Sequence, residues 1–149
     1  MKLQNKTAIV TAASTGIGRE TAIALAKEGA RVLLVARTED KLRETKRLIE
    51  REGGKAEIHV VDLSDISSIN KVIDEIKKNY KTINILCNIA GIWHGKDIVY
   101  AEKDYETFNQ KVIIDTYNVG VIAPSLLAHG FIPLMPEGSS IVNLSGTFQ

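Results

Sequence analysis

The chain has 149 residues, of which 44% are hydrophobic and 25% charged, and its formal net charge is +1. Acidic and basic residues are mixed along the chain, without the basic stripe that indicates a nucleic-acid partner, and the length suits one domain with a sizeable core. The apolar runs are shorter than a membrane span, and Met1–Asn5 has no apolar signal core. We therefore expect a cytoplasmic protein with a single domain over residues 1–149, without nucleic-acid or membrane partners.

The first predicted element is a buried strand over residues 8–10, followed by a loop of small residues and a helix that starts near Ile17. Gly16 and Gly18 remove side chains at the point where the helix begins. The free backbone N–H groups and positive dipole end of such a helix favour an anion, for example a pyrophosphate. The alternative is that the glycines only allow strand and helix to pack closely.

Strands and helices alternate along the rest of the chain. Further strands are expected over residues 31–36, 56–61, 83–87 and 140–144. Helices are expected over 38–52, capped by Thr38-Glu39-Asp40, over 64–76, capped by Ser64-Asp65, and over about 103–131, with a kink or end near Ala123 because of Pro124. This alternation predicts an α/β fold, a doubly wound parallel sheet of the Rossmann-like type in three α/β/α layers, with ligands at the carboxyl ends of the strands.

The first loop resembles the T-G-x-x-x-G-x-G loop of the short-chain dehydrogenase/reductase family. The resemblance implies contacts to a nicotinamide cofactor from Thr11, Ser14, Thr15, Gly16, Ile17 and Gly18. One residue departs from the pattern, since Ala12 stands where the family usually has its first glycine. A methyl group there would strain a turn that needs a positive φ and would narrow the approach to phosphate. This departure concerns cofactor affinity rather than the fold.

The second strand is followed by Arg37, a residue that bears on the choice between NADP and NAD. A carboxylate here would suit a ribose 2′-hydroxyl, whereas an arginine pairs with a 2′-phosphate. The sequence therefore favours NADP, with NAD less favoured. The alternative is a surface ion pair between Arg37 and Glu39 or Asp40.

The ends of the third and fourth strands carry two more matches to the family. By resemblance Asp62, beside Leu63, binds the adenine amino group, although the same aspartate also suits a turn ahead of Ser64. The segment Asn88–Gly91 resembles the N-N-A-G motif, with Ile89 in place of the second asparagine, and Asn88, Ala90 and Gly91 are expected at the cofactor. Four ordered matches at four strand ends identify the chain as a member of the family over all 149 residues.

The resemblance also implies a reaction, in which hydride moves between the nicotinamide and a carbonyl or alcohol carbon of a small molecule. In the family a tyrosine is the acid/base, a lysine lowers its pKa, a serine polarises the substrate oxygen, and an asparagine anchors a water. We expect Ser145 and Asn118 to be the catalytic serine and asparagine. Counting by the family's spacing leaves Gly146 and Tyr117 as the alternatives, and no metal site is expected.

The tyrosine and lysine are expected after Ser145, beyond Gln149. We therefore expect an N-terminal part of an NADP-dependent oxidoreductase, without the C-terminal strands and helices and inactive alone. The exposed edge of the last strand and the uncovered face of the last helix would favour a homo-oligomer. The alternative function is a nucleotide-binding module without hydride chemistry.

Overall fold

The structure is a computed structural model that describes residues 1–92 and 103–145. One parallel sheet has the strand order β3-β2-β1-β4-β5, as expected for a doubly wound fold. The strands are β1 (Thr7–Thr11), β2 (Arg31–Ala36), β3 (Lys55–Val60), β4 (Ile85–Asn88) and β5 (Ser140–Asn143). The chain winds outward from β1 to β3 and then returns to β4 on the other side of β1. The winding therefore reverses between β1 and β4, where such folds bind their ligands.

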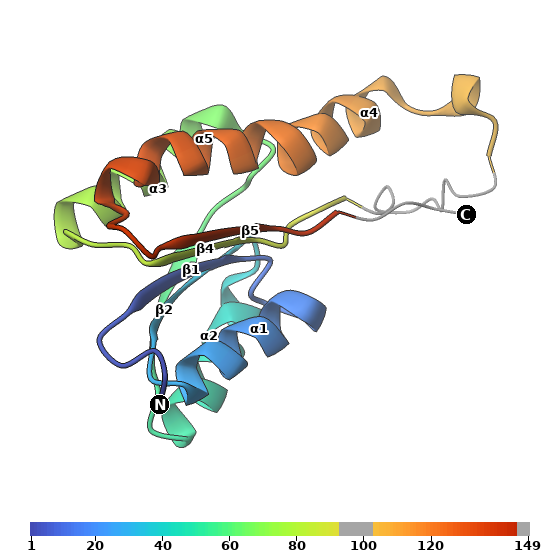
Figure 1. Cartoon of the computed structure of the whole chain (residues 1–149). Helices are drawn as coiled ribbons and strands as arrows, with labels where there is room; N and C mark the ends of the chain where they lie inside the picture. Colours follow the sequence, from blue (N-terminus) through green and yellow to red (C-terminus); the bar gives the residue numbers. More distant parts are fainter. Residues whose placement is uncertain (93–102, 146–149) are drawn as a thin grey trace.

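Helices cover both faces of the sheet (Figure 1). One face carries α1 (Gly16–Lys27) and α2 (Glu39–Arg51), and the other carries α3 (Ile66–Asn79), α4 (Gln110–Tyr117) and α5 (Ala123–Phe131). Successive residues of β1 serve the two sides, because side chains alternate along a strand. Ile9 belongs to the core under α3 and α5, whereas Ala8 and Val10 belong to the core under α1 and α2.

The last helical region differs from the expected single helix over 103–131. A short 3-10 helix, η1 (Tyr105–Thr107), comes first, and the chain is extended at Asn109 before α4 begins at Gln110. The side chain of Asn109 caps α4 by accepting a hydrogen bond of 2.8 Å from the Lys111 N–H. This asparagine cap, which the sequence prediction overlooked, fixes where the helix begins.

A π-helical turn, η2 (Asn118–Ile122), joins α4 to α5 and explains the effect of Pro124. Proline has no N–H to donate to the carbonyl of Gly120, and its ring collides with that carbonyl in a regular helix. The wider turn, in which the Ala123 N–H reaches the Asn118 carbonyl, avoids this collision. The helical path therefore continues through Pro124 by way of η2 into α5 and then η3 (Ile132–Leu134).

The two predicted caps have different outcomes. The Asp65 carboxylate accepts hydrogen bonds from the N–H groups of Ser67 and Ser68 at 3.2 and 3.0 Å, which confirms it as the cap of α3. Thr38 is the N-cap residue of α2, but its side chain makes no capping hydrogen bond. Glu39 and Asp40 in the first turn of α2 instead complement the positive end of the helix dipole.

The helical stretch Gln110–Leu134 is long and apolar enough to cross a membrane by length and composition. Its buried residues, among them Val119, Leu127 and Phe131, belong to the core shared with α3. Its other face is uncovered, with Ile114, Tyr117 and Val121 each more than half exposed. The sheet edge at β5 is also uncovered, and all four of its residues are exposed.

Candidate nucleotide-binding site

A cavity of about 300 Å³ lies where the winding of the sheet reverses, at the carboxyl ends of β1, β2 and β3. The predicted cofactor residues that line it are Ser14, Thr15, Arg37, Asp62, Leu63, Ala90 and Gly91. Thr11, Gly16, Ile17, Gly18 and Asn88 do not line it. A larger cavity of about 390 Å³ lies at the opposite ends of the strands, near Lys6 and Lys55, and contains none of the predicted residues.

Gly18 allows the loop after β1 and the start of α1 to pack closely, which is the alternative that the sequence left open for this glycine. Gly18 has no room for a side chain, because a Cβ there would lie 2.2 Å from the carbonyl oxygen of Ala12. Thr15 is the N-cap residue of α1, but its side chain makes no capping hydrogen bond. The first N–H groups of the helix are therefore not capped by Thr15. These donors and the helix dipole make this end of the cavity favourable for an anion.

Ala12 adopts the strained backbone that its position in the loop suggested. Its φ is +54°, in the left-handed region that favours glycine. The alanine is therefore an unfavourable residue for this turn, and the surrounding structure holds it in place.

Thr11 acts inside the structure rather than at the cavity wall. Its side-chain oxygen accepts hydrogen bonds from the N–H groups of Ile89 and Ala90, at 2.8 and 3.0 Å. It also donates to the carbonyl of Cys87 at 3.4 Å. The buried threonine thus holds the segment after β4 against the loop after β1, which brings Ala90 and Gly91 to the cavity.

Arg37 follows β2 and is exposed at the cavity. In residues 1–92 and 103–145 it forms no ion pair, and Glu39, one of its two proposed surface partners, pairs with Arg43 instead. Lys41, in the first turn of α2, also lines the cavity. Sequence reasoning missed Lys41, although its place four residues after Arg37 at the start of a helix was the available signal.

Asp62 makes the turn that was the alternative to a ligand contact. Its Oδ1 accepts hydrogen bonds from the Ser64 N–H at 2.9 Å and the Ser64 hydroxyl at 2.7 Å. Burial alone would raise the pKa of Asp62, but the hydrogen bonds from Ser64 and the charge of Arg37 lower it below its usual value. Asp62 therefore contributes a negative charge to the wall that faces Arg37.

The two predicted catalytic residues are in different environments. Ser145 lines a separate cavity of about 360 Å³, together with Asn88, Gly120 and Asn143. The side chain of Asn118 instead donates a hydrogen bond of 3.1 Å to the carbonyl of Ser64. Neither Asn118 nor Tyr117 lines the cavity of Ser145, and the alternative position Gly146 lies outside the described residues.

A model of the short chain dehydrogenase family matches residues 6–148. The chain belongs to this family. The uncharacterized oxidoreductase YxbG of Bacillus subtilis is 39% identical over 145 residues, which are 97% of this chain and 51% of that protein. A fatty acyl-CoA reductase of Acinetobacter baylyi is 31% identical over 96% of this chain and 48% of its own length. The chain spans about half the length of the curated relatives it matches.

Solved structures of the family share the fold. A metagenomic short-chain oxidoreductase in complex with NADP superposes with a TM-score of 0.90 at 32% identity, covering 99% of this chain and 65% of that one. The promiscuous reductase LugOII, which catalyses keto-reduction at C1 in lugdunomycin biosynthesis, gives a TM-score of 0.82 at 34% identity, over 95% of this chain and 59% of its own.

Replacement of Ala12 by glycine is expected to raise the free energy of unfolding by about 1 kcal/mol, because glycine adopts a positive φ without strain. The measurement is urea denaturation followed by circular dichroism. Ala13→Gly is the matched control, since Ala13 is fully buried and has a negative φ, and it should lower stability. Equal destabilisation by both glycines would contradict a strained Ala12.

Proposed function

We propose that these 149 residues provide the nucleotide-binding half of an NADP-dependent short-chain dehydrogenase. In the full-length enzyme, hydride would move between the nicotinamide and a carbonyl or alcohol carbon of a small molecule. The observation that carries the choice of cofactor is the pair of cations at the cavity, Arg37 and Lys41, beside Ser14 and Thr15. A 2′-phosphate would accept charge-assisted hydrogen bonds from these two cations, whereas a free 2′-hydroxyl carries no charge to match them.

The other proposed contacts follow from the arrangement of the cavity. The pyrophosphate would lie at the N-terminus of α1, next to Gly16, Ile17 and Gly18. The adenine would lie against Asp62 and Leu63, on the wall that faces Arg37. The backbone of Asn88, Ala90 and Gly91 would border the remainder of the cofactor. The hydroxyl of Thr11 holds this backbone segment in place.

Replacement of Arg37 by glutamine is expected to weaken NADP⁺ binding about tenfold or more, because a charge-assisted contact is lost, and to leave NAD⁺ binding nearly unchanged. Titration calorimetry with both nucleotides measures this difference. Arg47→Gln is the matched control, because Arg47 is an exposed arginine of α2 that does not line the cavity. Equal losses for NADP⁺ and NAD⁺ would contradict the 2′-phosphate assignment.

For the chemical step we propose Ser145 as the group that polarises the substrate oxygen and Asn118 as its partner in the proton relay. In the structure two groups of Asn118 are engaged within the protein. Its side-chain amide donates to the Ser64 carbonyl, and its backbone carbonyl accepts from the Ala123 N–H. By resemblance the acid/base is a tyrosine paired with a lysine, and neither is assigned among these residues. The alternative remains a nucleotide-binding module without hydride transfer.

We expect no NADPH-dependent reduction of a panel of ketones and aldehydes by the isolated chain, because no tyrosine–lysine pair has been assigned to it. The measurement is NADPH absorbance over time, with Ser145→Ala as the background control. Turnover clearly above that control would show that the chain already contains a working acid/base. The gene sequence downstream of the Gln149 codon then separates the dehydrogenase from the binding module.

We also propose a cytoplasmic homo-oligomer, in which the exposed apolar face of α4 and α5 contacts a second copy. This face presents Ile114, Tyr117 and Val121 to solvent, which is unfavourable for an isolated domain.

Wild-type chain is expected to sediment as a dimer or larger species, and Ile114→Ser combined with Val121→Ser should shift it towards the monomer. The matched control is Val60→Ser, which removes an apolar side chain that is 53% exposed on β3, at the opposite edge of the sheet from β5. Sedimentation velocity over a range of concentrations measures the shift. A wild-type chain that remains monomeric at high concentration would refute the proposal.

A further inference from the structure

Three consecutive carbonyl groups anchor the backbone of the loop between β1 and α1. The carbonyl of Ala12 lies against Gly18, in the space that any side chain at that position would need. The carbonyl of Ala13 accepts a hydrogen bond of 3.0 Å from the Thr45 hydroxyl. The carbonyl of Ser14 accepts two from Arg19, at 2.7 Å from Nη2 and 3.1 Å from Nε. Two of the three anchors are therefore side chains from neighbouring helices.

Thr45 holds the middle of the loop from within the core. It lies on α2 and is fully buried. Its hydroxyl is also 3.1 Å from the Lys41 carbonyl of its own helix, so its single proton has two possible acceptors. The N–H of Ala13 donates to the Val35 carbonyl at 3.3 Å, so residue 13 is fixed on both sides, by β2 and by α2.

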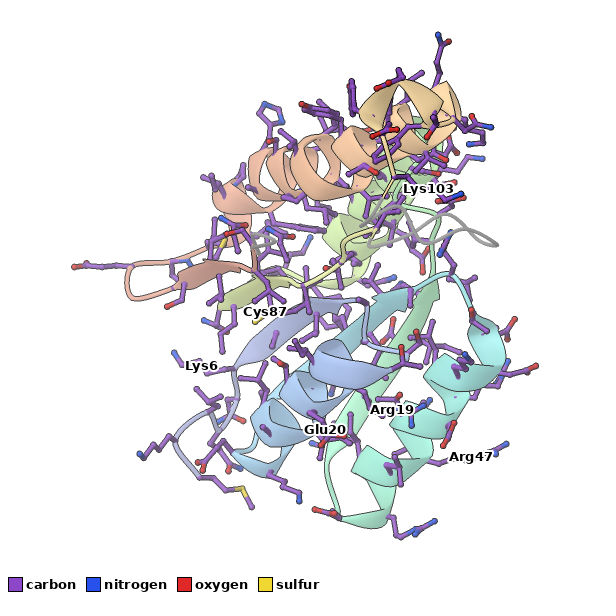
Figure 2. All side chains as sticks on the ribbon, turned by 90° about the vertical axis from the view of Figure 1, so that its right-hand side faces the viewer. Lys6, Arg19, Glu20, Arg47, Cys87 and Lys103 are labelled. Atoms are coloured by element: carbon purple, nitrogen blue, oxygen red, sulfur yellow. The ribbon has the colours of Figure 1, made fainter. Side chains whose placement is uncertain are left out.

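Arg19 is itself held in place by a carboxylate. Its guanidinium lies between α1 and α2 (Figure 2), where Glu44 accepts hydrogen bonds at 3.4 Å from Nη1 and 3.1 Å from Nη2. Only 20% of the Arg19 side chain is exposed. The rigid fork of the guanidinium thus connects Ser14 of the loop to Glu44 of α2.

These anchors determine which way the loop presents its donors. In a trans peptide the C=O and the following N–H point in opposite directions. Because the carbonyls of Ala13 and Ser14 point to the helices, the N–H groups of Ser14 and Thr15 point away from them. Both of these residues line the cavity, so the loop offers positive dipole ends on that side. These contacts lie next to Ala12, whose φ of +54° is unfavourable for alanine.

We propose that Thr45 and the Arg19–Glu44 pair are positioning residues, which hold the loop in the conformation that receives the pyrophosphate of the cofactor. The proposal rests on the proposed nucleotide-binding function. It gives this part of the chain two separate tasks, since Arg37 before α2 and Lys41 in its first turn would face the 2′-phosphate, whereas Glu44 and Thr45 would control the pyrophosphate loop. Ligands with and without a pyrophosphate therefore separate the two tasks.

The test compares NADP⁺ with adenosine 2′-monophosphate, which has the adenine and the 2′-phosphate but no pyrophosphate. Thr45→Val keeps the side-chain shape and removes the hydroxyl, and it should weaken NADP⁺ binding about tenfold while leaving adenosine 2′-monophosphate within about twofold. Thr45→Ser keeps a hydroxyl and should restore NADP⁺ affinity. Titration calorimetry gives both constants, and thermal unfolding shows whether each variant folds.

Glu44→Gln is a second variant that does not depend on the core, because the Glu44 side chain is 57% exposed. Removal of a negative charge near an anion site would by itself strengthen NADP⁺ binding. The positioning role predicts the opposite sign, a loss of about threefold for NADP⁺ alone, because Arg19 loses its support. Glu50→Gln, on the same helix and paired with Lys46, is the matched control.

The outcomes separate the two proposals. If wild-type chain binds neither nucleotide, the proposed function fails. If wild-type chain binds both, but Thr45→Val and Glu44→Gln leave NADP⁺ affinity unchanged or weaken both ligands equally, the positioning role is overturned. Selective loss for NADP⁺, with rescue by Thr45→Ser, supports it.

Discussion

The arrangement of the crevice depends on one buried hydroxyl, that of Thr11. It accepts two backbone N–H groups from the segment after β4 and donates to the Cys87 carbonyl of the same strand. β1 and β4 are adjacent in the sheet but distant in sequence, and the winding reverses between them. Thr11, at the end of β1, accepts hydrogen bonds from N–H groups after β4. It therefore aligns the loop after β1 with the loop after β4, which are distant in sequence. Loss of this contact would leave two buried N–H groups without partners, which is costly.

Charged side chains line the part of the cavity near β2 and β3, whereas the end formed by the loop after β1 presents backbone groups. One wall carries Arg37 and Lys41, and the facing turn carries the ionised Asp62, whose pKa is lowered although burial opposes ionisation. The end of the cavity carries no charged side chain from the loop, because Arg19 is directed to Ser14 and Glu44. Recognition of an anion at that end would therefore rely on backbone dipoles, and the exact path of the backbone has more influence there than side-chain identity.

Much of this fold could be predicted from the sequence, because the apolar runs of β1 and β2 and the glycines after them are local signals. The resemblance to the family's loop raised the question of strain at Ala12 for the case of a positive φ, and the structure has a φ of +54° there. The start of α4 was missed because the Asn109 cap is a single residue within a polar stretch. Pro124 was expected to bend or end the helix, but its actual effect, a π-helical turn, depends on which carbonyl its ring meets. Thr45 was missed because its role arises from a contact between α2 and a loop that is distant in sequence, as the Thr45–Ala13 hydrogen bond shows.

The strand order also determines when during synthesis the crevice can exist. β1, α1, β2, α2 and β3 follow one another in the chain and are neighbours in the sheet, so this unit can form from local contacts as it emerges from the ribosome. β4 must then insert beside β1, which by that time is an open edge. Until it does, the hydroxyl of Thr11 lacks the donors that it satisfies in the native state. At that stage the loop after β1 already has its contacts to Thr45 of α2 and Arg19 of α1, whereas the segment after β4 that forms the opposite wall of the cavity is still absent.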